Sequence, residues 1–377
     1  MGGLLGPNTH MNGNHFRWGI LGTAQIARKN WRAIRDSGNP IVAVASRHLE
    51  RSRRFIAECQ AEVPFETIPE AYGSYESLLA SPAVDAVYIP LPTGLRKEWV
   101  LRAAAAGKHI VSEKPCAVSV ADLREMLEAC RRHRVQFMDG VMFMHSRRLD
   151  RMRAALDDGQ SVGEIRSITS AFSFRAPPEF FTSNIRGSSE LEPHGCLGDL
   201  GWYCIRFALW VMGWQMPQQV TGRILNQFQA PGSPAPVPTE FSGELLFSGG
   251  VSAGFYSSFL TGIEQWANVS GSLGHLEISD FVLPVAGKES TFRVHKTVFN
   301  TVGCEFKMES HPERFTVAEH SHGHATAQEA ILFRNFADQV RSGRPNEAWP
   351  EMALKTQIVM AACLESARAE SRPIQLG

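Results

Sequence analysis

Short apolar, β-prone runs alternate with amphipathic helical runs through residues 16–140, and this alternation constrains the fold more than any other feature. A strand, a helix and a further strand in succession form a parallel sheet with right-handed crossovers. Such a sheet binds its ligand at the carboxyl ends of its strands. Residues 16–140 are therefore predicted to form an α/β domain with a site along that edge. The strands are expected at residues 16–21, 41–45, 86–90, 109–112 and 136–138.

The pattern changes at about residue 141, where alternating runs follow one another with few helices between them. This texture predicts a second, α+β domain over residues 141–377 with a large, mostly antiparallel sheet. One helix interrupts it, from Asp199 to about Gly213, and helices at 325–341 and 351–370 close the chain and are placed to pack back on the first domain. A further helix is expected at 146–157, with strands at 165–174, 239–247, 251–259, 267–269 and 276–279.

Composition narrows the class of protein. With 377 residues, of which 44% are hydrophobic, the chain is long enough for two cores. The zero formal net charge argues against a nucleic-acid surface, and no apolar run reaches the roughly 18 residues of a membrane span. Seven scattered cysteines without a Cys-x-x-Cys pair indicate reduced thiols and a cytoplasmic protein, with organelle import left open. Residues 1–15 are expected to be a disordered tail.

The turn after the first strand reads Gly22-Thr23-Ala24-Gln25-Ile26-Ala27. It stands where a glycine-rich turn and a helix N-terminus hold a pyrophosphate in dinucleotide-binding domains. Ala24 replaces the middle glycine of that pattern, so an ordinary strand-to-helix turn is the alternative interpretation.

The second strand ends at Ser46 and Arg47, over the expected position of the adenosine ribose. A carboxylate here selects NAD, whereas a hydroxyl and a guanidinium suit a 2′-phosphate, so NADP is predicted as the cofactor. Arg53 and Arg54, by contrast, are assigned to the solvated face of the next helix.

Glu113-Lys114-Pro115 follows the apolar strand at residues 109–112. A lysine between a carboxylate and a proline at a strand's carboxyl end is placed for chemistry rather than for packing. Pro90, Leu91, Pro92 and Thr93 end the neighbouring strand and complete the expected cofactor contacts.

Asp199 and Tyr203 are four residues apart on the interrupting helix and therefore share a face, with Arg206 on the same stripe. A tyrosine hydroxyl can serve as an acid or a base if its pKa is tuned. The alternative interpretation is a core tyrosine with an aspartate as helix N-cap.

Taken together, these residues resemble the Gfo/Idh/MocA oxidoreductases from residue 17 onward. The resemblance rests on Gly19-Ile20-Leu21-Gly22, Glu113-Lys114-Pro115, Asp199-Leu200-Gly201-Trp202-Tyr203 and the segment 270–276. Tyr203 leans toward the branch with glucose–fructose oxidoreductase, dimeric dihydrodiol dehydrogenase, xylose dehydrogenase and 3-ketosugar reductases, and uncharacterized plant oxidoreductases are similar in texture.

The resemblance implies a Rossmann domain, a substrate-binding domain with an open sheet, and a homodimer or higher homo-oligomer made through that sheet. It implies that Lys114, Asp199 and Tyr203 meet beside a nicotinamide, where Tyr203 acts as acid/base on a sugar, polyol or dihydrodiol. We expect Lys114 to lower the pKa of Tyr203 and burial to oppose it. Arg96, which replaces a histidine common in the family, suggests a contact to an anionic group. The alternative class is a non-catalytic NADP-binding regulator on the same fold.

Other residues carry weaker signals. Arg186 lies in a loop that lines the substrate pocket in the family, with a surface arginine as the alternative. Phe180, Phe181 and Trp202 suit stacking on a sugar ring or a place in the core. The alternation of His320, His322 and His324 suggests metal ligation, but the intervening glycine and the absence of a paired carboxylate argue against it, and no metal is predicted.

Overall fold

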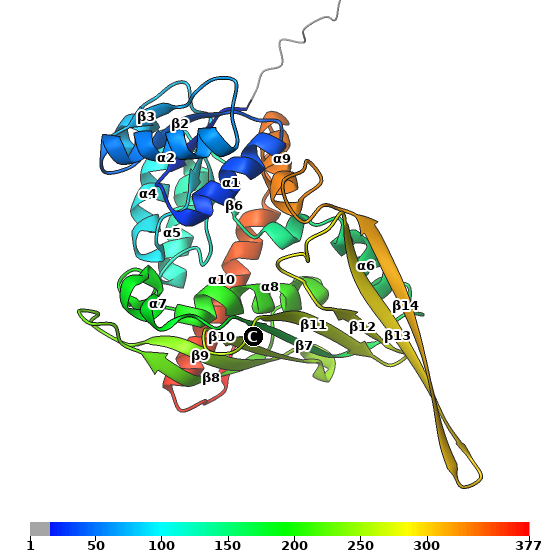
Figure 1. The fold of residues 1–377 in the computed structure, drawn as a ribbon. Helices are drawn as coiled ribbons and strands as arrows, with labels where there is room; N and C mark the ends of the chain where they lie inside the picture. Colours follow the sequence, from blue (N-terminus) through cyan, green and yellow to red (C-terminus); the bar gives the residue numbers. More distant parts are fainter. Residues whose placement is uncertain (1–15, 377) are drawn as a thin grey trace, which may run out of the picture.

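The computed structural model describes residues 16–376 and contains two sheets, each covered by helices (Figure 1). The tail expected at residues 1–15 lies outside the described residues.

The first sheet has six parallel strands in the order β3-β2-β1-β4-β5-β6. β1 and β4 are buried along their whole length, as parallel strands covered on both faces must be. The strand order reverses between β1 and β4, and ligands bind such sheets at this switch point. The strands are β1 Trp18–Leu21, β2 Ile41–Ala45, β3 Glu70–Tyr72, β4 Ala86–Ile89, β5 His109–Ser112 and β6 Phe137–Asp139. The helices are α1 Gln25–Asp36, α2 Leu49–Glu62, α3 Tyr75–Leu79, α4 Thr93–Ala105 and α5 Val120–Arg132.

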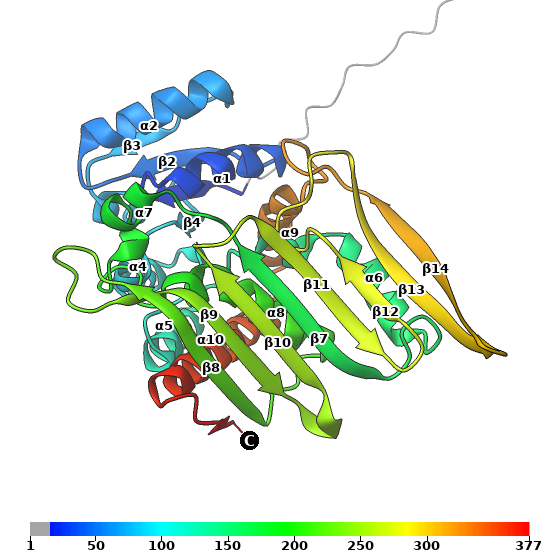
Figure 2. The same cartoon turned by 60° about the horizontal axis from the view of Figure 1, so that its bottom comes forward.

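The second sheet has nine strands in the order β14-β13-β12-β11-β7-β10-β9-β8-β15. Its neighbours are antiparallel except for β7 and β10, and the sheet is open, so the predicted fold class is confirmed. Figure 2 shows this sheet from the side that no helix crosses, with α6, α8 and α10 behind it. The strands are β7 Ile165–Ser173, β8 Gln219–Phe228, β9 Val237–Leu246, β10 Ser252–Ser258, β11 Glu264–Gly271, β12 His275–Ile278, β13 Glu289–Val302, β14 Glu305–Ala318 and β15 Ile374–Gln375. The helices of this half are α6 Arg148–Asp157, α7 Pro178–Ser183, α8 Trp202–Val211, α9 Gln328–Arg341 and α10 Ala348–Arg368. Short helical turns are η1 Met142–His145, η2 Ile185–Gly187, η3 Leu197–Gly201 and η4 Ser248–Gly250.

A long hairpin of β13 and β14 projects from the second sheet (Figure 1). Each of its strands has 14 residues, and the outer halves are exposed on both faces. This hairpin was not expected from the sequence, because its outer residues do not show the apolar alternation of a half-buried strand.

Late segments of the chain tie the two halves together. Phe333 of α9 makes an edge contact with Trp18 of β1 at 5.1 Å between ring centroids, and Phe336 lies 5.4 Å from the same ring. Arg206 of α8 forms a fully buried ion pair with Asp139 at the end of β6. The second domain is therefore held against the first through α9, which packs on β1, and through α8, which pairs with the carboxyl end of β6.

Candidate functional site

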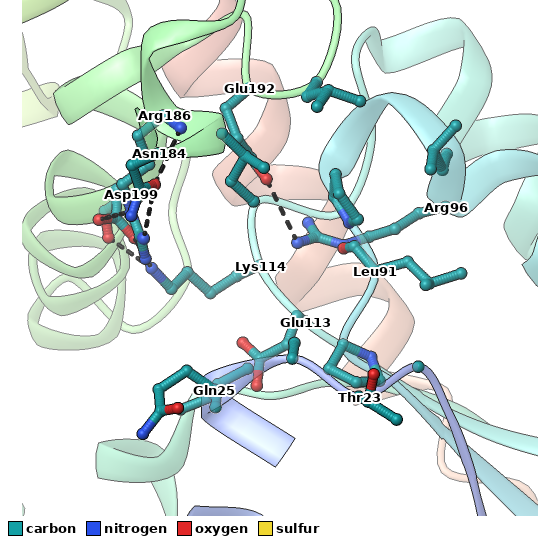
Figure 3. Close-up of a pocket in the computed structure, with 18 of the residues that line it drawn as sticks. Thr23, Gln25, Leu91, Arg96, Glu113, Lys114, Asn184, Arg186, Glu192 and Asp199 are labelled. Atoms are coloured by element: carbon teal, nitrogen blue, oxygen red, sulfur yellow. Dashed lines mark hydrogen bonds and ion pairs between the residues drawn. The ribbon is translucent and has the colours of Figure 1, made fainter. Parts of the chain in front are cut away.

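A cleft of about 1420 Å³ lies where the carboxyl ends of β1, β2, β4 and β5 face the second domain. Figure 3 shows side chains of both halves around it, with Thr23 and Gln25 on one wall and Asn184, Arg186 and Asp199 on the other. The expected cofactor residues that line the cleft are Gly22, Thr23, Ala24, Gln25, Ile26, Ser46, Arg47, Pro90, Leu91, Pro92, Glu113 and Lys114.

The turn at Gly22 is built for close approach. Its φ of +119° is a conformation that side-chain-bearing residues avoid, and an added Cβ would lie 3.0 Å from Leu91 Cδ2. Ala24 is the N-cap of α1 with φ −69° and ψ 158°, which any residue adopts, so its methyl group does not disturb the backbone. No side chain caps this helix. Because the first amides of a helix lack partners within it, the turn offers N–H donors to an anion and fits a pyrophosphate.

Ser46 and Arg47 stand differently at the far end of the cleft. Ser46 is buried, and its hydroxyl donates to the carbonyl of His48 at 2.7 Å and accepts from Ser52 Oγ at 3.0 Å. Arg47 is exposed on the cleft wall, and Arg51 lines the same wall. The guanidinium of Arg47 can therefore orient toward a ligand. The Ser46 hydroxyl is used within the protein, where its hydrogen bonds stabilise the backbone after β2.

Lys114, Asp199 and Tyr203 lie together, as the family resemblance implied. Lys114 Nζ donates to Asp199 Oδ1 at 2.8 Å and to the Asp199 carbonyl, and it lies 4.6 Å from the centroid of the Tyr203 ring. Arg186 Nε donates to Asp199 Oδ2 at 2.6 Å from the opposite side (Figure 3). Asp199 is therefore held between two cations that come from different domains.

Burial and charge set the protonation of this cluster. Burial alone would raise the pKa of Asp199, but the charges of Arg186 and Lys114 hold it well below its usual range. Burial lowers the pKa of Lys114, but Asp199, together with Tyr203 and Glu113, outweighs this, so the net shift is upward and Lys114 stays an ammonium. Burial raises the pKa of Tyr203 to about 12, although Lys114 opposes the rise. The expected lowering by Lys114 is present, but burial outweighs it and the phenol is neutral at pH 7.

The helix that carries Asp199 begins differently from the prediction. Residues Leu197–Gly201 form a π-helical turn, and regular α8 starts only at Trp202. π-Helical turns of this kind are frequent at functional sites. An added Cβ on Gly198 would lie 2.6 Å from His194 Cβ and 3.0 Å from Pro115 Cγ. Glycine therefore lets this turn approach Pro115 closely enough for Asp199 to reach Lys114.

Two expected ligand contacts are corrected by the structure. Trp202 is 0% exposed, so it belongs to the core and cannot stack on a sugar. Thr93 is 1% exposed and does not line the cleft. Its hydroxyl donates to Glu192 Oε2 at 2.6 Å, and its amide donates to Glu192 Oε1 at 3.1 Å, so it joins the domains. Local periodicity contained no signal for the partner, Glu192.

Arg96, Phe180 and Phe181, the remaining candidates, make contacts within the protein. Arg96 lines the cleft but is 4% exposed, and its Nε donates to the Leu91 carbonyl at 2.7 Å while Nη1 donates to Thr93 Oγ1 at 3.1 Å. Its guanidinium thus braces the turn after β4, and its Nη2 pairs with Glu192 Oε1 at 3.9 Å, so a carboxylate of this chain already occupies it (Figure 3). Phe180 and Phe181 pack edge to face at 5.5 Å between centroids, outside the cleft lining.

Other motifs form no further centre. The rings of His320 and His324 stack at 3.8 Å and share Thr326 Oγ1, and residues 16–376 contain no group of three metal-ligating side chains. All seven cysteines are free. Within the described part of the chain, no helix has the length and apolar character needed to cross a membrane.

Comparison with known proteins shows which family this chain resembles. A model of the Gfo/Idh/MocA oxidoreductase family with an NAD-binding Rossmann fold matches residues 16–141, and one of the Gfo/Idh/MocA C-terminal domain matches residues 149–277. The chain is 34% identical over 278 residues to D-xylose 1-dehydrogenase (NADP(+)) 2 of Haloferax volcanii, covering 73% of this chain and 80% of that protein. It is 30% identical over 295 residues to trans-1,2-dihydrobenzene-1,2-diol dehydrogenase of Mus musculus, covering 73% and 83%.

A solved structure shares the whole architecture. The 3-ketoreductase from Actinomadura kijaniata, in complex with NADP and TDP-benzene, superposes with a TM-score of 0.74 at 26% identity, covering 95% of this chain and 98% of that one. The resemblance drawn from the sequence motifs is confirmed by the family models and by these relatives together. The chain therefore belongs to the Gfo/Idh/MocA family of oxidoreductases.

Proposed function

We propose that this oxidoreductase uses NADP to move a hydride between the nicotinamide and a carbinol or ketone carbon of a sugar, polyol or dihydrodiol. The observation that carries the proposal is the cluster of Lys114, Asp199, Arg186 and Tyr203, which faces the cleft opposite the anion-binding start of α1. The named activities of the relatives, on xylose, dihydrodiols and ketosugars, support this substrate class.

The proposed cofactor fits the shape and charge of the cleft. The start of α1 suits the pyrophosphate, and Arg47 at the far end suits a 2′-phosphate. The relatives whose names or structures include NADP support the same choice. When bound, the nicotinamide would supply or accept the hydride.

In the proposed mechanism the protein transfers a proton to or from the substrate oxygen and stabilises charge on that oxygen. The Tyr203 hydroxyl donates its proton to the substrate oxygen during reduction and takes it back during oxidation. An ammonium has three donors, of which Lys114 uses two on Asp199, so one remains to stabilise charge on that oxygen. Asp199 and Arg186 fix the position of Lys114. Solved variants of the related 3-ketoreductase that alter one lysine and one tyrosine support the choice of these residue types.

Removal of the Arg47 guanidinium should weaken binding of NADPH but not of NADH. A charge-assisted hydrogen bond to a phosphate is lost in Arg47→Ala, which predicts a rise of about tenfold to a hundredfold in the Kd for NADPH. Fluorescence titration with both nucleotides measures this. Arg53→Ala is the matched control, because Arg53 pairs with Glu50 on the surface of α2. Equal loss of NADH affinity would contradict the assignment of Arg47 to the 2′-phosphate.

The two reaction directions should depend differently on pH. Tyr203, with its pKa raised to about 12 by burial, carries its proton at neutral pH, which is the form needed for reduction. The reduction rate should therefore be flat between about pH 6 and 9, whereas the oxidation rate, which needs the phenolate, should rise about tenfold per pH unit. Initial rates in both directions at constant ionic strength test this. An oxidation rate that ignores pH would contradict the role of Tyr203.

We further propose that the chain forms a homodimer through the open face of the second sheet. That face is not crossed by a helix in Figure 2, and sheets seldom leave so broad a face without a partner layer. Light scattering should give twice the chain mass of 41.7 kDa. A monomer at micromolar concentration would refute the dimer.

The proposed activity can be tested directly. Purified protein is incubated with NADPH and a panel of ketosugars, or with NADP⁺ and a panel of aldoses, polyols and dihydrodiols, and absorbance at the nicotinamide band is followed. Turnover of at least one compound is expected. Binding of NADPH without turnover of any of them would favour the non-catalytic regulator instead.

A further inference from the structure

A second, small cavity lies behind Tyr203. Its volume is about 20 Å³, and it lies between α1, β4, β5, α8 and α9. Tyr203 and Glu113 line both this cavity and the main cleft, so their side chains stand between the two spaces. A space of this size holds one water molecule if enough polar groups face it.

Glu329, in the first turn of α9, is the group in this wall without an evident role. The residue is 4% exposed, and its Oε2 is buried without a hydrogen-bond partner among residues 16–376. Its Oε1 lies 3.9 Å from Lys29 Nζ, and the Lys29 side chain is 36% exposed. A buried carboxyl oxygen without a partner is destabilising, so its place beside a water-sized cavity points to a bound water.

The other polar groups of the wall are held in place. Tyr88 donates to Glu113 Oε1 at 2.6 Å, and Asn30 Nδ2 donates to the Tyr88 hydroxyl oxygen at 2.6 Å. Together with Tyr203 and Glu329 they provide more than the two to four partners that a buried water needs. The titratable groups that line the cavity with Glu329 are Tyr88 from β4, Glu113 from the end of β5 and Tyr203 from α8, and Lys29 of α1 lies beside Glu329.

We propose that this cavity binds one water that connects the Tyr203 hydroxyl to Glu329, and that protons reach Tyr203 from solvent through Lys29, Glu329 and this water. The proposal rests on the proposed function. After Tyr203 gives its proton to the substrate oxygen, the Lys29 ammonium gives a proton to the Glu329 carboxylate. The resulting carboxylic acid gives a proton to the water, the water gives one to the phenolate, and solvent reprotonates Lys29. The sum is one proton from solvent per reduction, and oxidation reverses the path.

Such a path answers a geometric need. Tyr203 is 6% exposed and lines the cleft that cofactor and substrate would fill. The path leads from the phenol behind the cleft wall to Lys29, which lines the cleft and whose side chain is 36% exposed, so it keeps contact with solvent. Glu329 is then a positioning and relay residue and touches neither substrate nor cofactor.

The test compares Glu329→Gln with the wild-type enzyme on a substrate found in the panel above. The amide keeps the volume and the bond to water but cannot pass the proton on. We expect kcat to fall about tenfold or more and the solvent deuterium isotope effect on kcat to rise, with KM and melting temperature nearly unchanged. A loss of kcat with an unchanged isotope effect would reduce Glu329 to a structural role and overturn the relay.

The matched control is Glu319→Gln. Glu319 is 1% exposed and accepts from Ser146 Oγ at 2.7 Å and from the amide of Arg147, and it does not line the cavity. This variant should lower the melting temperature and leave the isotope effect at its wild-type value. An equal rise in both variants would show that loss of any buried carboxyl produces the effect, and would overturn the proposal.

A second measurement needs no substrate. A high-resolution experimental structure should show an ordered water within hydrogen-bond distance of Glu329 Oε2 and a polar group of the opposite wall. An empty cavity would overturn the proposal even if the enzyme is active. If the wild-type chain turns over no compound, both the proposed function and the relay are refuted. If the wild type is active and the Glu329→Gln variant has the wild-type kcat and solvent isotope effect, only the relay is refuted.

Discussion

Replacement of Tyr203 with phenylalanine should lower kcat about 10²–10⁴-fold, the range that a positioned general acid contributes. The change removes only the hydroxyl. The ring would keep its contacts with Phe172 and Phe143, at 5.6 and 6.1 Å between centroids, and its place under the Lys114 ammonium. Binding of NADPH and the melting temperature should therefore stay close to wild type. Steady-state kinetics, nucleotide titration and thermal unfolding measure the three quantities.

Tyr256→Phe is the matched control for this change. Tyr256 lies in β10, outside the cleft lining, and its hydroxyl bonds to Glu240 on the second sheet. Its loss should leave kcat unaltered. A Tyr203→Phe enzyme with turnover within about twofold of wild type would rule out the phenol as the acid and shift attention to Lys114.

Removal of the Asp139 carboxylate should destabilise the fold by about 3–5 kcal/mol, because it leaves a buried guanidinium without its counter-charge. Arg206 is 1% exposed and Asp139 3% exposed. Arg206 Nη1 donates to Asp139 Oδ1 at 3.3 Å, and Nε donates to Thr356 Oγ1 at 2.7 Å, so the arginine joins β6 of the first domain to α8 and α10 of the second. Denaturant unfolding of Asp139→Ala against wild type measures the loss.

The double variant Asp139→Leu with Arg206→Met separates charge from packing. Replacing a whole buried ion pair by apolar side chains of similar volume is often nearly neutral, so most of the lost free energy of unfolding should return. If the double variant is as unstable as Asp139→Ala, the effect comes from the shape of these side chains and not from the unpaired charge.

The bounds of strands could be predicted from the sequence where the strands are buried on both faces. β2 and β5 begin and end at the predicted residues, because a parallel strand covered by helices is a nearly continuous apolar run. The same rule missed β13 and β14, whose outer residues are exposed on both faces and show no continuous apolar run. It also missed the π-helical turn at Leu197–Gly201, since a helix pattern with one extra residue per turn looks like an ordinary helix start.

Within the site, helical periodicity predicted which residues of the segment from Asp199 onward share a face. It could not predict which face another segment of the chain would bury. Asp199 and Tyr203 do share one, and both reach the cleft. Trp202, which directly precedes Tyr203 in the chain, is buried in the core. A residue's exposure depends on segments far away in the sequence, and these contacts are not encoded in local spacing.

By itself the sequence determined that Lys114 stands at the carboxyl end of a buried parallel strand, because strand ends follow from hydrophobic runs and the chemistry of that edge follows from the parallel sheet. Only the tertiary structure decided what surrounds the lysine. Docking of the second domain brings Asp199 and Arg186 to one side of it, buries Tyr203 deeply enough to raise its pKa, and sets Glu329 behind that ring. Distances and desolvation arise from the packing of elements up to hundreds of residues apart, which residue types and their local order do not specify.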